Sequence, residues 1–228
     1  MQPSGSLLPL LSHCRHPLAW DRFPARYNSK ASETGTLVHD ACLRDGGGAF
    51  MIEALASKYP LADAKQAARW AKTFEDWWAR GELGSEWKYE QMFAYQAGVA
   101  RPIESRTQLR AGEVATSVDA YAVDTFASHA WIVDLKTSSR RKSIDDHWHQ
   151  LMFYALCVTR AHKCEVASIC VAQPLDGSVN FDAVSVNAEE IEAFERWYQN
   201  LRPDSPNVGP WCSGLFCPVK SECKGHNP

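Results

Sequence analysis

Asp134 and Lys136 are the residues of this sequence best suited to chemistry, because they end the apolar run of residues 131–133. The three other acid-x-lysine tripeptides of the chain do not follow such a run. In a strand, residues two apart share one face, so Asp134 and Lys136 point together while Leu135 points into the opposite layer. A charged pair at the buried end of a core strand costs free energy of folding unless it has a further partner or a functional role. The pair therefore predicts a functional site.

A second carboxylate, Asp119, lies on the preceding strand-like segment, residues 113–124. If this segment forms a hairpin with residues 130–136, Asp119 and Asp134 approach each other across it. Two carboxylates and the Leu135 carbonyl suit Mg²⁺ or Mn²⁺, which prefer oxygen ligands. Such an ion activates water, and Lys136 can orient that water or stabilise negative charge developing on a phosphate. The alternative is a surface hairpin with ordinary solvated aspartates.

Two helical segments carry further candidates. Gln150 and Tyr154 are four residues apart and therefore share one helical face. The alternative is that Tyr154 belongs to the core and Gln150 is its solvated neighbour. His39 follows Gly35 by four residues in another helical segment, where a single histidine most often has a structural role.

The overall charge excludes one class of nucleic-acid binder. The chain has 24 Lys and Arg against 27 Asp and Glu, a net charge of −3, so it is not a uniformly basic domain. Its basic residues can still act locally. Arg140, Arg141 and Lys142 follow Lys136 closely, and a basic loop there would collect phosphates with an affinity that falls as salt rises. The alternative is a solvated loop.

We expect the elements that position these residues to form an α/β protein of one domain. Its 228 residues suit a single domain, and no apolar run approaches the ~20 residues that a membrane span needs. The N-terminus lacks a basic region and a long apolar stretch, so we expect a cytoplasmic protein. After an irregular first 30 residues, hydrophobic periodicity predicts helices beginning near Glu33 and covering about 61–80, 145–161 and 188–201. Strands are predicted at 86–95, 113–124, 130–136, 164–172 and 178–186, which gives a mixed central sheet flanked by helices.

The eight cysteines fall into two groups. Four of them lie among apolar or helical neighbours and are expected to pack as small hydrophobic residues: Cys42, Cys157, Cys164 and Cys170. Three others, Cys212, Cys217 and Cys223, crowd a tail that follows a proline-rich stretch. In a reducing compartment such a cluster favours metal binding over disulfides, with a fourth ligand from elsewhere. Zinc and an iron–sulfur cluster both accept four cysteines, and incidental thiols on a frayed tail are the remaining alternative.

Taken in order, these motifs resemble a known family. His39, Asp119, the Asp-x-Lys of residues 134–136 and the Gln-x-x-x-Tyr of residues 150–154 resemble the RecB-type nucleases of the PD-(D/E)xK superfamily. One cysteine before the core, Cys14, and three after it are similar to the iron–sulfur exonuclease branch, which includes AddB-type subunits and the CRISPR-adaptation nuclease. The resemblance covers about residues 5–225.

The resemblance implies a role for each matching residue. His39, Asp119 and Asp134 would hold the metal with the Leu135 carbonyl, and Lys136 would be the catalytic lysine. Gln150 and Tyr154 would orient DNA and the site. Glu90 stands where these nucleases often have an acidic residue, and it ranks below the other ligands. A [4Fe–4S] cluster, or Zn²⁺ instead, would be held by four cysteines: Cys14, Cys212, Cys217 and Cys223.

The implied fold is restriction-endonuclease-like. A single nuclease domain, residues 1–228, would comprise a helical N-terminal segment, residues 1–82, a core at 83–202 and a cysteine-rich tail at 203–228. The implied activity is metal-dependent exonucleolytic cleavage of DNA, preferably of single strands or free ends, in recombination, repair or CRISPR adaptation. No phosphate-binding G-x-x-x-x-G-K-[ST] loop is present, so any helicase would be a separate partner. A catalytically inactive DNA-binding subunit and a structure-specific endonuclease are the alternatives.

Overall fold

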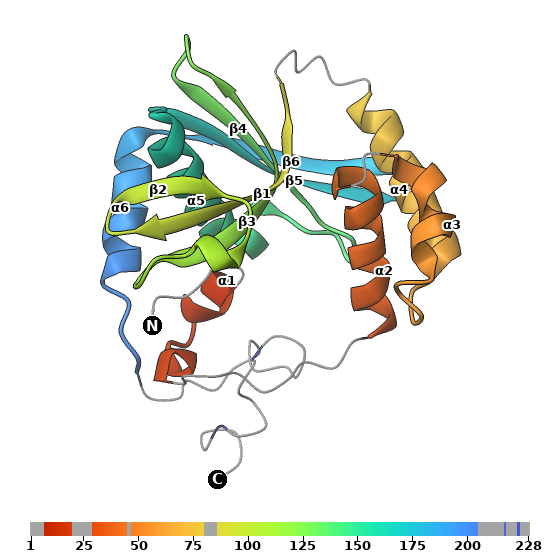
Figure 1. Cartoon of the computed structure of the whole chain (residues 1–228), viewed down its shortest axis with the longest axis horizontal. Coiled ribbons are helices and arrows are strands. Elements are labelled where there is room, and N and C mark those ends of the chain that lie inside the picture. Colours follow the sequence, from red (N-terminus) through yellow and green to blue (C-terminus); the bar gives the residue numbers. More distant parts are fainter. Residues whose placement is uncertain are drawn as a thin grey trace.

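A six-stranded mixed sheet lies between two layers of helices (Figure 1). The computed structural model describes residues 7–19, 29–44, 47–79 and 86–204, together with Cys217 and Cys223. The strand order is β2-β1-β3-β4-β5-β6, in which only β4 and β5 pair in parallel. The strands are β1 Lys88–Gln96, β2 Val99–Ile103, β3 Val114–Asp124, β4 His129–Leu135, β5 Val166–Leu175 and β6 Ser178–Val186. The predicted α/β class and mixed sheet are confirmed.

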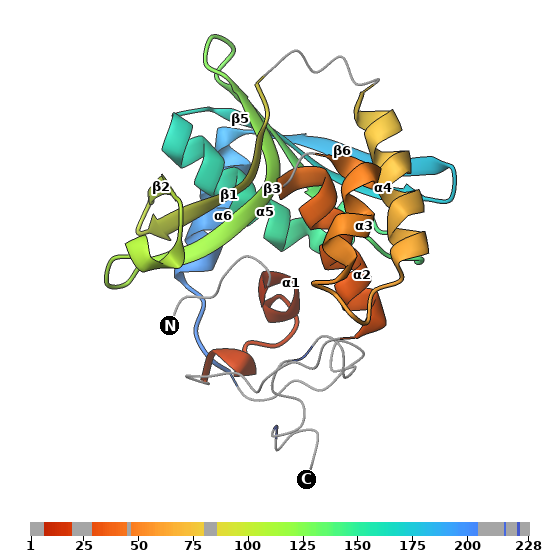
Figure 2. The same cartoon turned by 45° about the vertical axis from the view of Figure 1, so that its right-hand side comes forward.

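Helices cover both faces of the sheet, as the second view shows (Figure 2). One layer contains α1 Leu8–Leu11, α5 Ile144–His162 and α6 Ala188–Gln199. The other contains α2 Lys30–His39, α3 Met51–Ala56 and α4 Ala64–Trp78. The long helix α5 connects the parallel strands β4 and β5, which a hairpin turn cannot join.

The central strand β4 explains why two cores form. Its neighbours on both sides and the helices above and below leave it almost wholly buried, which matches its continuous apolar run. Ile132 packs with Phe153 of α5 in one core, whereas Val133 and Leu135 pack with Leu37 of α2 in the other. Because side chains alternate along β4, Ile132 faces the layer of α5, whereas Val133 and Leu135 face the layer of α2.

Several boundaries differ from the prediction for local physical reasons. Helix α2 begins at Lys30 rather than near Glu33, because the Ser29 side chain accepts a hydrogen bond from the amide of Ser32 and caps the helix. Strand β2 was not predicted; it is an edge strand, where Pro102 is tolerated. The N-terminal stretch expected to be irregular contains α1, which packs on α5.

The cysteine predictions are partly borne out. Cys157 and Cys170 are buried, as expected, whereas Cys42 and Cys164 are only half-buried. Of the predicted cluster ligands, Cys14 and Cys223 are buried and Cys217 is half-buried against the core of the α5 layer. Cys212 lies outside the described residues. Among the described helices, none combines the length and the apolar character that crossing a membrane requires.

Candidate active site

Three acidic residues lie side by side across the middle of the sheet. In β1 and β3, Tyr89 pairs with Ala120 and Gln91 with Val118, so Glu90 stands opposite Asp119. In β3 and β4, Ala120 pairs with Val133, and the next position along places Asp119 opposite Asp134. The predicted hairpin of β3 and β4 is therefore present, and the backbone N–H of Leu135 donates to Asp119 Oδ2 at 2.8 Å.

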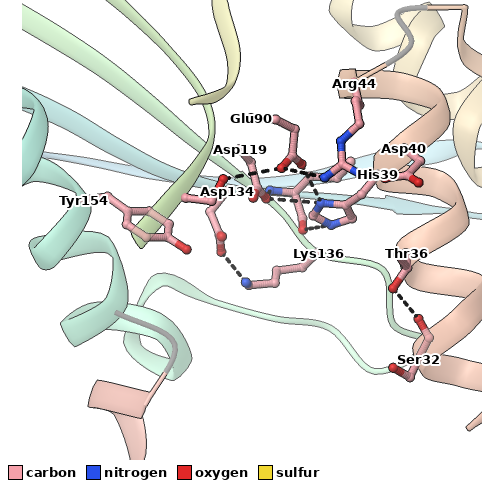
Figure 3. Close-up of polar contacts among 12 residues, drawn as sticks. Ser32, Thr36, His39, Asp40, Arg44, Glu90, Asp119, Asp134, Lys136 and Tyr154 are labelled. Atoms are coloured by element: carbon pink, nitrogen blue, oxygen red, sulfur yellow. Dashed lines mark hydrogen bonds and ion pairs between the residues drawn. The ribbon is translucent and has the colours of Figure 1, made fainter. Parts of the chain in front are cut away.

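Glu90 has an unusual backbone conformation. Its φ is 48°, in the left-handed region that a residue with a side chain avoids, although it lies within a strand. Such strain costs about 1–3 kcal/mol and persists where the surrounding structure enforces it, often at functional sites. The carboxylate reaches His39, with 3.7 Å between Glu90 Oε1 and His39 Nδ1 (Figure 3).

His39 joins the acidic row from the last turn of α2. Its Nε2 lies 2.7 Å from the Leu135 carbonyl oxygen, and its Nδ1 lies 3.6 Å from Asp119 Oδ2. Gly35 permits this approach, because a Cβ atom at that position would lie only 2.5 Å from Thr137 Oγ1. Helix α2 and the segment after β4 are thus in contact one helical turn before His39.

The electrostatics of the group favour a positively charged occupant. Burial lowers the pKa of His39, but the charges of Asp119 and Glu90 outweigh it and raise that pKa to about 9. Burial raises the pKa of Asp119 to about 6; Asp134 adds to this rise, while His39 and Lys136 oppose it. In the metal-free site, a protonated His39 offsets part of the negative charge of the row.

Asp134 and Lys136 form a buried ion pair. The Asp134 side chain is 1% exposed, and its Oδ2 lies 2.7 Å from Lys136 Nζ. Apart from this pair, neither carboxylate oxygen of Asp134 has a hydrogen-bond partner among the described residues. A buried carboxylate without hydrogen bonds is costly, so the site calls for a further cation or donor.

The residues present fit a divalent metal ion. One ligand atom from each of His39, Glu90 and Asp119 lies within 4.8 Å of the others. Asp134 is the next carboxylate of the row, and within the described ranges its two oxygen atoms accept no hydrogen bond. This oxygen-rich set, together with the Leu135 carbonyl, suits Mg²⁺ or Mn²⁺. Glu90, ranked last from the sequence, belongs to the most compact group of ligands.

Helix α5 presents the predicted Gln150 and Tyr154 to the same site. Both are buried, and Gln150 Nε2 donates to the Tyr154 hydroxyl at 2.6 Å. Burial raises the pKa of Tyr154 well above its usual range, and the charges of Asp134 and Asp119 raise it further. Tyr154 therefore faces the carboxylates from the side opposite His39 and stays protonated (Figure 3).

Sequence reasoning missed His147, three residues before Gln150 on the same helix. Its Nε2 is buried without a hydrogen-bond partner in the described part of the chain. Burial and the charge of Lys136 lower the pKa of His147 to about 4, so its ring is neutral. The spacing of His147, Gln150 and Tyr154 is the helical i, i+3, i+7 pattern, which was the available signal.

The predicted basic loop is held to the sheet by hydrogen bonds. Gln173, fully buried on β5, donates from Nε2 to the carbonyls of Ser138 and Arg140 and accepts from the Lys142 amide. Arg140 and Arg141 are exposed, and within the described ranges no ion pair neutralises them or Lys142. Their charges are thus free to meet an anion.

Comparison with known proteins gives one informative match. The family model of the PD-(D/E)XK nuclease superfamily matches residues 15–224. No curated protein matches the chain. Among solved structures, the chain is similar to the crystal structure of SSO0001, with 13% identity, 94% of each chain covered and a TM-score of 0.38. At this TM-score the likeness says nothing about function.

Proposed function

Because the chain belongs to the PD-(D/E)XK nuclease superfamily, we propose that it is a metal-dependent DNA exonuclease that acts on single strands or free ends. The superfamily supports a metal-dependent nuclease and a DNA substrate. The observation that carries the assignment to this site is the acidic row of Glu90, Asp119 and Asp134 with His39 at its edge. Apart from the ion pair with Lys136, the buried Asp134 oxygens have no hydrogen-bond partner among the described residues.

The metal would be held by His39, Glu90, Asp119 and Asp134, with the Leu135 carbonyl beside them. When bound, Mg²⁺ or Mn²⁺ supplies Lewis acidity that polarises the phosphate and lowers the pKa of a water molecule. The carboxylate row and the His39 imidazole fix the position of this chemistry on the rigid sheet rather than on a loop.

Lys136 is the residue that acts on the reacting groups. Asp134 holds its ammonium group at 2.7 Å, which restricts where the charge can point. From there Lys136 stabilises the negative charge that grows on the phosphate in the transition state and orients the attacking water. Tyr154, kept protonated and fixed by Gln150, closes the α5 side of the site.

Substrate would be drawn in by the loop that follows β4. Arg140, Arg141 and Lys142 lie in the chain between Lys136 and the start of α5, so they would gather phosphates on the segment that leaves the catalytic lysine. This local charge accounts for DNA binding by a chain whose net charge is −3.

We further propose that Cys14, Cys212, Cys217 and Cys223 bind a [4Fe–4S] cluster, with zinc as the alternative. The order of motifs and this cysteine frame support grouping with RecB-type iron–sulfur exonucleases that act in recombination, repair or CRISPR adaptation, with any helicase supplied separately. Protein purified without oxygen should be brown; a colourless protein containing zinc would refute the cluster.

A nuclease assay tests the central proposal. Linear and circular single-stranded DNA are incubated with the protein in Mn²⁺ or in chelator, alongside Asp134→Ala and Lys136→Ala. We expect Mn²⁺-dependent shortening of the linear strand from an end, and a rate at least 100-fold lower in both variants. Full activity in either variant would refute the site. Cleavage of the circle would indicate an endonuclease, and binding without cleavage would indicate an inactive subunit.

A further inference from the structure

The helix that carries His39 continues past it in a different form. Residues Asp40–Arg44 form a π-helix directly after α2. In such a helix hydrogen bonds span five residues, so the residue five positions after His39 lies about one turn along on the same side. Arg44 is that residue, and it lines the same pocket as His39, Glu90 and Asp119. Short π-helical insertions of this kind are frequent at functional sites.

One half of the Arg44 guanidinium is fixed. Its Nη1 lies 2.9 Å from Asp40 Oδ1, and Asp40 is buried. The Tyr59 hydroxyl donates to the other oxygen of the same carboxylate. Asp40 is thus held from two sides, and it anchors a guanidinium on a side chain that is otherwise 60% exposed.

The other half of the guanidinium faces the acidic row. Arg44 Nη2 lies 3.7 Å from Glu90 Oε2, beyond direct hydrogen-bonding distance (Figure 3). Nη2 is thus in an ion pair with Glu90 without a hydrogen bond to it, and because Asp40 anchors the other half of the guanidinium, this N–H group can donate to a phosphate.

The pocket in front of Arg44 has room for a phosphate group. Its volume is about 410 Å³, and its wall includes the hydroxyl-bearing side chains of Ser32, Thr36 and Thr137. A nucleic acid approaching this wall meets the carboxylates of Glu90 and Asp119, which repel its phosphates. Arg44 provides a compensating positive charge at the exposed edge of the pocket.

We propose that this pocket is a second phosphate subsite, in which Arg44 binds a phosphate of the DNA strand next to the one being cleaved. The inference rests on the proposed nuclease function and deepens it, because it assigns the α2 side of the site to the substrate strand while the Arg140–Lys142 loop serves the α5 side. The bound group is either an internal phosphodiester or the terminal phosphate of a strand end.

The test compares Arg44→Met and Arg44→Lys with a matched control, Arg69→Met. Arg69 lies on α4, is also 60% exposed and, in the part of the chain that the structure describes, has an ion pair of the same length as that of Arg44 with Glu90, 3.7 Å from Asp176. Steady-state cleavage of labelled linear single-stranded DNA is measured over a series of salt concentrations. Arg44→Met should raise KM about tenfold with kcat changed less than threefold, and should lower the slope of log KM against log salt by about 0.7. Arg44→Lys should raise KM but leave the salt slope of KM unchanged, because lysine keeps the positive charge and lacks the planar guanidinium that makes two parallel hydrogen bonds.

Two substrate forms separate the sources of the phosphate. If Arg44→Met raises KM only for strands with a 5′-phosphate and not for strands with a 5′-hydroxyl, the subsite holds the terminal phosphate. An equal rise for both identifies an internal phosphodiester. KM and salt slope equal to those of Arg69→Met would overturn the proposal, as would a change confined to the Mn²⁺ requirement.

Failure of the subsite is distinguishable from failure of the nuclease assignment. If the wild-type protein cleaves no DNA, the proposed function fails, and fluorescence anisotropy of labelled DNA still measures the salt slope of binding for the same variants. Asp40→Asn provides a second variant that keeps the Arg44 side chain and weakens its anchor; it should raise KM by less than Arg44→Met does. An unchanged KM in Asp40→Asn together with an unchanged KM in Arg44→Met would refute the role of the pair.

Discussion

Replacing Gly35 with alanine tests the close packing that brings His39 to the carboxylates. A Cβ atom at residue 35 would lie 2.5 Å from Thr137 Oγ1 and 3.7 Å from Thr137 Cβ. The first distance is a clash and the second is an ordinary contact. The clash therefore belongs to the Thr137 hydroxyl position alone, and truncating Thr137 should remove it.

Two opposing terms set the magnitude. Alanine in place of glycine inside a helix is favourable by about 1 kcal/mol. Overpacking of this kind costs about 1–3 kcal/mol. Gly35→Ala alone should therefore lower the free energy of unfolding by about 1 kcal/mol, which is about 2–4 °C in Tm for a chain of this size. In a Thr137→Ala background the clash is gone, and the same change should raise stability by about 1 kcal/mol.

The assay is urea unfolding and Mn²⁺-dependent cleavage, with Gly35→Ala introduced into three backgrounds: the wild type, Thr137→Ala and Thr137→Val. Gly35→Ala should also lower kcat, because α2 must shift and carry His39 away from Asp119, and Thr137→Ala should restore it. Thr137→Val is the matched control, since its second methyl group occupies the place of Oγ1 and keeps the clash. If Gly35→Ala changes stability equally in all three backgrounds, the close approach of α2 to Thr137 is wrong.

Three other perturbations follow from the site. Glu90→Gly relieves the left-handed backbone strain of about 1–3 kcal/mol and adds an entropic loss of about 0.5–1 kcal/mol, so it should stabilise the metal-free protein slightly in urea. The same change should weaken Mn²⁺ binding at least tenfold, and Glu90→Gln should weaken binding without the gain in stability. His39 keeps its proton up to pH about 9 in the metal-free site, where its raised pKa adds stability that is present below pH 6.5 and lost as the pH rises through 9. Mn²⁺ must displace this proton, so the Mn²⁺ affinity measured by calorimetry should rise up to tenfold per pH unit between pH 6.5 and 9. Below about pH 6 the affinity should change more steeply with pH, because Asp119 is also protonated there. A Mn²⁺ affinity independent of pH would contradict His39 as a ligand. Gln173→Met leaves three polar backbone groups of the basic loop without their partner. It should lower the free energy of unfolding in urea by about 2 kcal/mol and raise KM for DNA. If both values are unchanged, Gln173 does not organise the loop.

Local sequence patterns predicted how the residues at the centre of the candidate site are placed. The apolar run before Asp134 marked a buried strand, strand alternation aligned Asp134 with Lys136, and helical spacing placed Gln150 beside Tyr154. Each of these inferences needs only the period of one element. The hairpin that brings Asp119 to Asp134 needed one further assumption, that adjacent strands pair, and the sheet confirms it.

The remaining features depend on tertiary structure. The left-handed backbone of Glu90 and the π-helix that returns Arg44 to the His39 side are distortions that no periodic pattern encodes. The contacts of buried Gln173 with the basic loop join residues more than 30 positions apart. Residues such as these become visible as functional candidates only when the surrounding elements are in place.

Isothermal titration of the metal-free protein with Mn²⁺, without DNA, tests the central claim most directly. One site should be filled by the wild-type chain, with protons released on binding, and Asp119→Asn should lose that site while remaining folded by circular dichroism. Equal Mn²⁺ binding by the wild type and Asp119→Asn would contradict the assignment of this acidic row as the metal site of a nuclease.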